Sequence, residues 1–193
     1  GIGQGVTVSN YSRQVDQSLL RQINGETATL QRQSTLDTYY NRLQAVFGTP
    51  EANSSVSHLI QSMADAFEQL AADPNKTLTQ QGAVTATSNV LTKLDDMSTE
   101  IQDLREAADK EIEDAVTTLN NTLDTIETLN TAISKAVAAD TPSSDLRDSL
   151  DIAIKEISSY MDISYFFKSD GRVAIYTQSG RPLIDETAST LSH

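Results

Sequence analysis

The feature that most constrains this chain is a run of helical periodicity between Thr77 and Ala139. Apolar residues recur there at steps of three and four, which follow one face of an α-helix. At 1.5 Å per residue this run predicts one helix of roughly 90 Å. A stripe of that length needs long partner helices to cover it, so the predicted fold is mainly α, an elongated bundle with one very long helix. The stripe comprises Leu91, Leu94, Met97, Ile101, Leu104, Ala108, Ile112, Val116, Leu119, Leu123, Ile126, Leu129, Ile133 and Val137.

The core of the predicted bundle is drawn from the same stripe. The steps average close to 3.6 residues and do not keep a strict repeat of seven, which favours nearly straight packing over a heptad supercoil. The predicted bundle core is Leu94, Ile101, Leu104, Ile112, Leu119, Leu123, Ile126 and Ile133.

Composition excludes several classes of function. The chain has 14 Lys and Arg against 27 Asp and Glu, a formal net charge of −13. Nucleic-acid binding is not expected, because phosphate recognition needs a basic face. No apolar run reaches membrane-spanning length, and no charged segment followed by an apolar one indicates a cleavable signal peptide. The absence of cysteine excludes disulfides and thiol chemistry.

Shorter elements are expected before the long helix. Residues 1–10 alternate glycine with apolar residues and predict an extended entry segment. A first helix follows and ends at Gly48-Thr49-Pro50. Ser54 or Ser55 caps a second helix that Asp73-Pro74 ends. The apolar positions of the first helix are Val15, Leu19, Ile23, Leu30, Tyr40, Leu43 and Phe47.

The character of the sequence changes after the long helix. Residues 140–144 indicate a break and a new N-cap, followed by a short amphipathic helix through Ile157. Residues 163–168 and 172–178 are β-rich and flank Asp170-Gly171, which predicts a hairpin, and Leu183-Ile184 begins a third short strand. The overall class is therefore α+β. The predicted domains are a long-helix rod domain over 1–142 and, over 143–193, the start of an outer β-rich domain.

Four segments, in order, resemble one protein family. They are Gly5-Val6-Thr7-Val8 before a helix, Phe67 through Leu70 to Asp73-Pro74, the Asn-rich helix from Leu119 to Ile133, and Asp145-Leu146-Arg147-Asp148 before the hairpin. Together they resemble the flagellar hook-associated protein 1 family over nearly the whole chain. Leu150 departs from the family pattern, and both terminal segments typical of the family are absent, so the resemblance implies that this chain is a central fragment.

The resemblance implies a structural role. A member of this family is a non-enzymatic subunit that joins the flagellar hook to its filament, transmits torque through packed subunits, and carries no cofactor. It is extracellular and exported without a cleavable signal peptide. Its partners are copies of itself and neighbouring axial proteins, with no nucleic acid and no membrane. Without its terminal segments the chain is expected to be a monomer that does not polymerise.

The polar side of the long helix supplies the candidate contact residues. A subunit-contact face is expected at Asn120, Asn121, Asp124 and Asn130, although a solvated helix face would carry the same residues. Catalytic and metal sites are not expected, because His58 and His193 are the two histidines and the acidic residues follow a helix. The alternatives are another flagellin-family axial protein, namely flagellin or the second junction protein, and a bacterial signalling coiled-coil rod.

Overall fold

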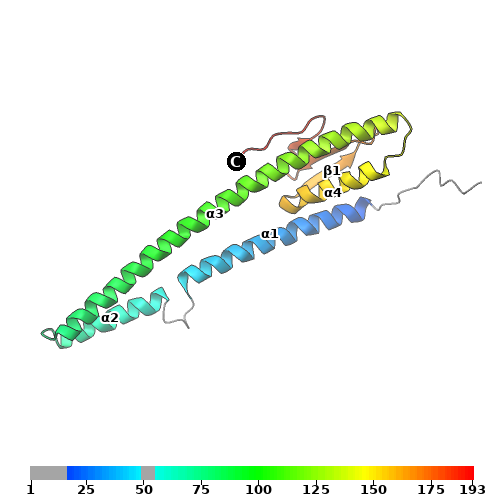
Figure 1. The fold of residues 1–193 in the computed structure, drawn as a ribbon. Helices are drawn as coiled ribbons and strands as arrows, with labels where there is room; N and C mark the ends of the chain where they lie inside the picture. The colour runs from blue at the N-terminus through cyan, green and yellow to red at the C-terminus, as the bar shows by residue number, and fades with distance from the viewer. Residues whose placement is uncertain (1–16, 49–54) are drawn as a thin grey trace, which may run out of the picture. The chain divides into compact units, whose positions relative to one another are not determined.

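The computed structural model describes residues 17–48 and 55–193. Within these two ranges, four helices precede three strands, and Figure 1 shows their arrangement. They are α1 (Gln17–Phe47), α2 (Val56–Ala72), α3 (Thr77–Ala138), α4 (Ser144–Tyr160), β1 (Ile163–Phe167), β2 (Val173–Thr177) and β3 (Pro182–Ile184). The prediction of a mainly α chain with one very long helix and a small hairpin region is confirmed. The expected entry segment at 1–10, Val15, Thr49, Pro50 and Ser54 lie outside the described residues.

Helix α3 is continuous over 62 residues, or about 93 Å at 1.5 Å per residue. It contains no proline, and its threonine hydroxyls donate to carbonyls one turn back, as at Thr118 and Thr122. It ends where Asp140 adopts a positive φ of 50° and the Thr141 amide donates to the Ala136 carbonyl over 2.9 Å. This left-handed ending, followed by Pro142, explains the break predicted from sequence.

The described residues fall into two compact units. One contains residues 17–34 and 112–193, and the other contains residues 35–48 and 55–111. Within the second, Ser55 caps α2 by accepting from the His58 amide over 3.3 Å. The first unit holds α4 and the whole sheet. The division of the chain into domains at residue 142 stays a prediction.

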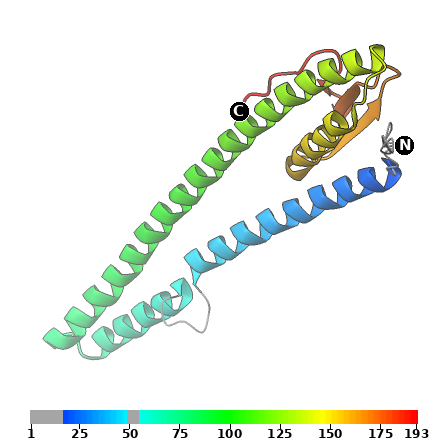
Figure 2. The ribbon, with the colours of Figure 1, turned by 45° about the vertical axis from the view of Figure 1, so that its right-hand side comes forward.

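The three strands form an antiparallel sheet in the order β1-β2-β3. Phe167 pairs with Val173 beside the turn, and Ile175 pairs with Ile184 on the other side of β2. The sheet and α4 lie along the C-terminal part of α3 in both views (Figures 1 and 2). One buried apolar cluster joins these three elements. Each large aliphatic side chain in it contributes about 1.5–3 kcal/mol by leaving water.

Half of the predicted bundle core is buried and half is not. Leu119, Leu123, Ile126 and Ile133 are at most 6% exposed, because they face the sheet and α4. Leu94 and Ile112 are 48% and 49% exposed, and Ile101 and Leu104 are half-buried. Within the described residues these four positions are not buried, although Met97 of the same stripe is, at 8% exposure; their place in a bundle core stays a prediction. Periodicity identifies a helix face but does not say which turns receive a partner.

Two turn glycines share one backbone conformation and differ in their surroundings. Gly171 has φ 84° and Gly180 has φ 83°. A Cβ at Gly171 would lie 3.0 Å from Ile133 Cγ2 and 3.1 Å from Arg147 Nη2, whereas a Cβ at Gly180 meets nothing within 4 Å.

We expect Gly171→Ala to destabilise the chain more than Gly180→Ala. The left-handed backbone costs both variants about 1–2 kcal/mol, and crowding adds roughly 1–3 kcal/mol at Gly171 only. Urea unfolding of the two variants measures this difference. Equal losses of unfolding free energy would contradict the close packing of this turn on α3.

Candidate functional site

The four predicted contact residues do not share one outer face. Asn121 and Asp124 are exposed on α3, as predicted. Asn120 is half-buried, and Asn130 is only 5% exposed. The prediction of an outward position is therefore wrong for Asn130 and incomplete for Asn120. Both side chains point to the sheet region because each lies four residues after an apolar member of the stripe, Val116 or Ile126.

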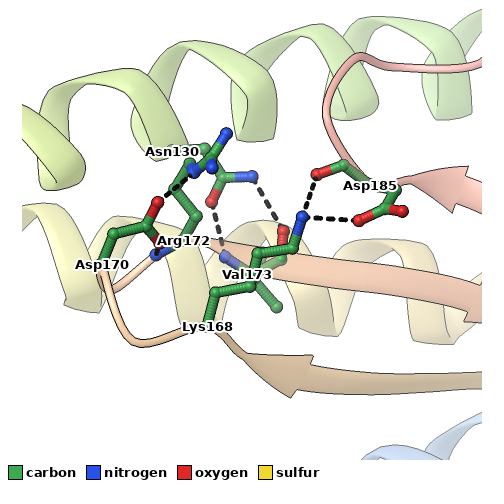
Figure 3. A network of polar contacts seen from close by, with 6 residues as sticks. All are labelled: Asn130, Lys168, Asp170, Arg172, Val173 and Asp185. Atoms are coloured by element: carbon green, nitrogen blue, oxygen red, sulfur yellow. Dashed lines mark hydrogen bonds and ion pairs between the residues drawn. The ribbon is translucent and has the colours of Figure 1, made fainter.

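Asn130 completes the hydrogen bonding of β2 (Figure 3). Its Oδ1 accepts from the Val173 amide over 2.8 Å, and its Nδ2 donates to the Val173 carbonyl over 2.9 Å. β3 has three residues, and its first and last pair with Tyr176 and Ile175 of β2. The side-chain amide of Asn130 takes the place of a further strand residue opposite Val173. Because these backbone groups are buried, their pairing removes a large desolvation penalty.

Asn120 makes the same pair of bonds to the segment that follows β3. Its Oδ1 accepts from the Leu191 amide over 2.8 Å, and its Nδ2 donates to the Leu191 carbonyl over 3.0 Å. Two turns further along α3, Glu127 Oε2 accepts from the Ala188 amide over 2.7 Å. Some polar side chains in this part of α3 therefore bind the backbone of the segment after β3, whereas others face solvent.

The exposed polar face of α3 borders an open groove. Its volume is about 560 Å³, and it is lined by Asp124, Glu127, Thr128, Thr131, Ala132 and Lys135. The Thr128 hydroxyl donates to the Asp124 carbonyl over 3.0 Å, so this part of the lining is satisfied within the helix. Of the predicted contact residues, Asn121 and Asp124 remain available on this side. Their role in subunit contact stays a prediction.

Two ion pairs brace the sheet around the hairpin turn (Figure 3). Lys168 Nζ lies 2.6 Å from Asp185 Oδ1, so this ion pair joins the residue after β1 to the residue after β3. Arg172 Nε lies 2.6 Å from Asp170 Oδ2 within the turn. Hydrogen bonding from Lys168 lowers the pKa of Asp185 below its ordinary value. Bonding from the Arg172 amide and then its side chain lowers the pKa of Asp170 in the same way.

These pKa shifts predict acid sensitivity. A carboxyl group with a depressed pKa in the folded state stabilises the fold above its unfolded pKa of about 3.9, and this stabilisation is lost as the pH falls through the folded pKa. We expect the urea midpoint to fall below about pH 4, and to fall less steeply in the Asp170→Asn/Asp185→Asn variant. An unchanged pH slope in that double variant would show that these pairs do not contribute.

Helix α1 presents an apolar face to solvent. Leu19, Ile23 and Leu30 are 54%, 44% and 70% exposed, whereas Asn24 and Ala28 are buried. At about 100° per residue, Ala28 lies about 180° around the helix from Leu19. The first half of α1 therefore packs within its unit through a small and polar face. Its predicted apolar positions point away, and the exposure continues at Tyr40, Leu43 and Phe47.

A second apolar surface lies in the unit of residues 35–111. A groove of about 370 Å³ runs between α2 and the start of α3. Its lining is mostly apolar, and Phe67 and Val84 within it are 49% and 67% exposed. Exposed apolar surface of this kind marks sites of protein contact.

Over residues 17–48 and 55–193, no group of three or more His, Asp or Glu side chains is placed to hold a metal ion. His58 is exposed on α2. In the same part of the chain, no helix has the length and apolar character that crossing a membrane requires.

This chain is similar to known proteins of the bacterial flagellum. The model of the flagellar hook-associated protein FlgK helical domain matches residues 40–192. The chain also has the fold of the flagellar hook junction protein FlgK from Burkholderia pseudomallei, with a TM-score of 0.74 and 23% sequence identity over 88% of this chain. It spans 29% of that protein. No curated protein matches.

The family match covers about four-fifths of the chain and includes α2, α3, α4 and the sheet. It confirms the resemblance found in the sequence. It also agrees with the course of the chain after α3, where the described residues turn into α4 and the sheet rather than into a second helix of similar length. This chain belongs to the flagellar hook-associated protein FlgK helical domain family.

Proposed function

We propose that the protein containing this chain is a structural subunit of the bacterial flagellum at the junction between hook and filament. The match to the FlgK helical domain carries the proposal, and the fold of the Burkholderia pseudomallei hook junction protein supports it. The protein acts by packing against other subunits and carries out no catalysis. It is exported to the flagellum, which lies outside the cell, without a cleavable signal peptide.

Helix α3 is suited to bearing load. Its 62 residues form one unbroken set of backbone hydrogen bonds, so force applied along the helix passes from turn to turn. The sheet and α4 are fixed to its C-terminal part by the buried cluster and by Asn130. Residues 143–193 in this proposal begin an outer β-rich domain that α3 holds in place.

The partners are copies of the same protein and neighbouring axial proteins. Two kinds of surface support this assignment. The exposed face of α1 offers Leu19, Ile23 and Leu30 for apolar packing. Asn121 and Asp124 offer polar groups on the exposed side of α3. Apolar burial would supply most of the affinity, and the polar groups would set the register between subunits.

Deletion of the gene that encodes this protein tests the proposal. We expect cells that build hooks but carry no filaments and that release flagellin into the medium, with recovery on expression of the full-length protein. Electron microscopy of the cell surface and immunoblotting of the medium are the two readouts. Filaments of normal number and length in the deletion strain would overturn the proposed junction role.

A further inference from the structure

The last described segment of the chain runs beside β3 and α3. After β3 the chain turns, Ile184 bridges to Ala188, and the Ser189 amide donates to the Leu183 carbonyl over 2.8 Å. Residues 188 and 189 therefore pair with the side of β3 that faces away from β2. Without this pairing, a three-residue strand would leave open backbone groups at the edge of the sheet.

Two side chains of α3 hold the same segment from the other side. Glu127 binds the Ala188 amide, and Asn120 binds both backbone groups of Leu191. The distances along the two segments match. From Ala188 to Leu191, three residues of extended chain rise about 10 Å, and from Asn120 to Glu127, seven helical residues rise about 10.5 Å. The segment runs antiparallel to α3, since the later residue of the segment meets the earlier residue of the helix.

We infer that residues 185–191 form a strap over the outer edge of β3 and that Asn120 and Glu127 are its latch. In this arrangement the latch keeps the β3 edge from pairing with the sheet of another copy of the chain. Such protection suits a protein that meets other copies at high local concentration, because an open edge accepts any extended segment. Asn120 is thus a positioning residue that acts through the backbone of Leu191.

Amide hydrogen exchange tests the latch. We expect Asn120→Leu to speed exchange at the Leu191 amide by roughly tenfold, as the loss of one hydrogen bond predicts, and to leave the Val173 amide unchanged. Asn121→Leu is the matched control, because it makes the same change one residue away at an exposed position. Asn120→Asp, which keeps an oxygen acceptor for the Leu191 amide, should retain more protection there than Asn120→Leu.

A second variant shifts residues 190 and 191 by one position relative to Asn120 and changes no residue of α3. Insertion of one glycine between Ser189 and Thr190 should release Leu191 while the helix content of the chain is unchanged.

The Asn120→Leu/Glu127→Leu variant should also self-associate at concentrations where the unaltered chain does not, as light scattering would show. Wild-type exchange at Leu191 in both the Asn120→Leu and insertion variants would overturn the latch. Faster exchange without association would overturn the protection of the β3 edge.

Discussion

Ile126→Asp is expected to unfold the part of the chain that contains the sheet. Ile126 is 0% exposed within the cluster shared by α3, α4 and the sheet. An unpaired carboxylate there costs on the order of several kcal/mol, a large part of the roughly 5–15 kcal/mol that stabilises a typical domain. Leu119→Asp, at 6% exposure, should have a similar effect. Urea unfolding followed by circular dichroism measures the loss.

Two controls separate burial from a general effect of mutation. Ile126→Val should cost about 0.5–1.5 kcal/mol, because it removes one methylene group. Asn121→Ala, on the exposed side of α3, should cost under about 1 kcal/mol. In the full-length protein the two aspartate variants should leave hooks without filaments. An Ile126→Asp variant as stable as Asn121→Ala would contradict the position of this residue in the core.

Asn130→Leu is expected to be the most damaging change of a polar residue on α3. It leaves the buried amide and carbonyl of Val173 without their partners. Each unpaired group costs about 1–3 kcal/mol, so the total is about 2–6 kcal/mol, even though leucine has a similar size. Urea unfolding gives the total loss, and hydrogen exchange at Val173 reports the position of the damage.

Asn121→Leu is again the matched control, because it places leucine on the exposed side of the same helix. Its unfolding free energy should stay within about 0.5 kcal/mol of the unaltered chain. If Asn130→Leu unfolded at the same urea concentration as Asn121→Leu, the bonds to Val173 would not stabilise the sheet.

Local signals were enough to predict most elements of the fold. The periodic run predicts residues 77–139 and the helix occupies Thr77–Ala138. Asp170-Gly171 predicts the hairpin turn, and Gly171 adopts the positive φ that such a turn requires. These features depend on neighbours in sequence, so they can be read without knowledge of packing.

Packing between distant segments could not be predicted in the same way. Leu94 and Leu123 occupy equivalent positions on the stripe, yet one is 48% exposed and the other 1%. Leu123 belongs to the buried cluster that α3 shares with the sheet and α4, which lie along the C-terminal part of α3 (Figure 2), and Leu94 does not belong to it. Sequence periodicity carries no information about where that cover begins.

In the candidate site, the position of Asn130 on α3 was a signal in the sequence that the prediction of an outer contact face missed. Asn130 lies four residues after Ile126 and three before Ile133, which places it on the apolar stripe itself. A polar residue at such a position must find a buried partner, so it indicates an internal hydrogen bond rather than an outer contact. The identity of that partner, the backbone of Val173, follows only from the folded sheet.

The protein containing this chain is proposed to form the joint between hook and filament. The most direct test of this role is to locate the full-length protein on intact flagella with antibodies against this chain, using gold-labelled electron microscopy. We predict label confined to the short zone where the hook meets the filament, and none in cells that lack the gene. Label along the whole filament, or at the cell body only, would contradict the account.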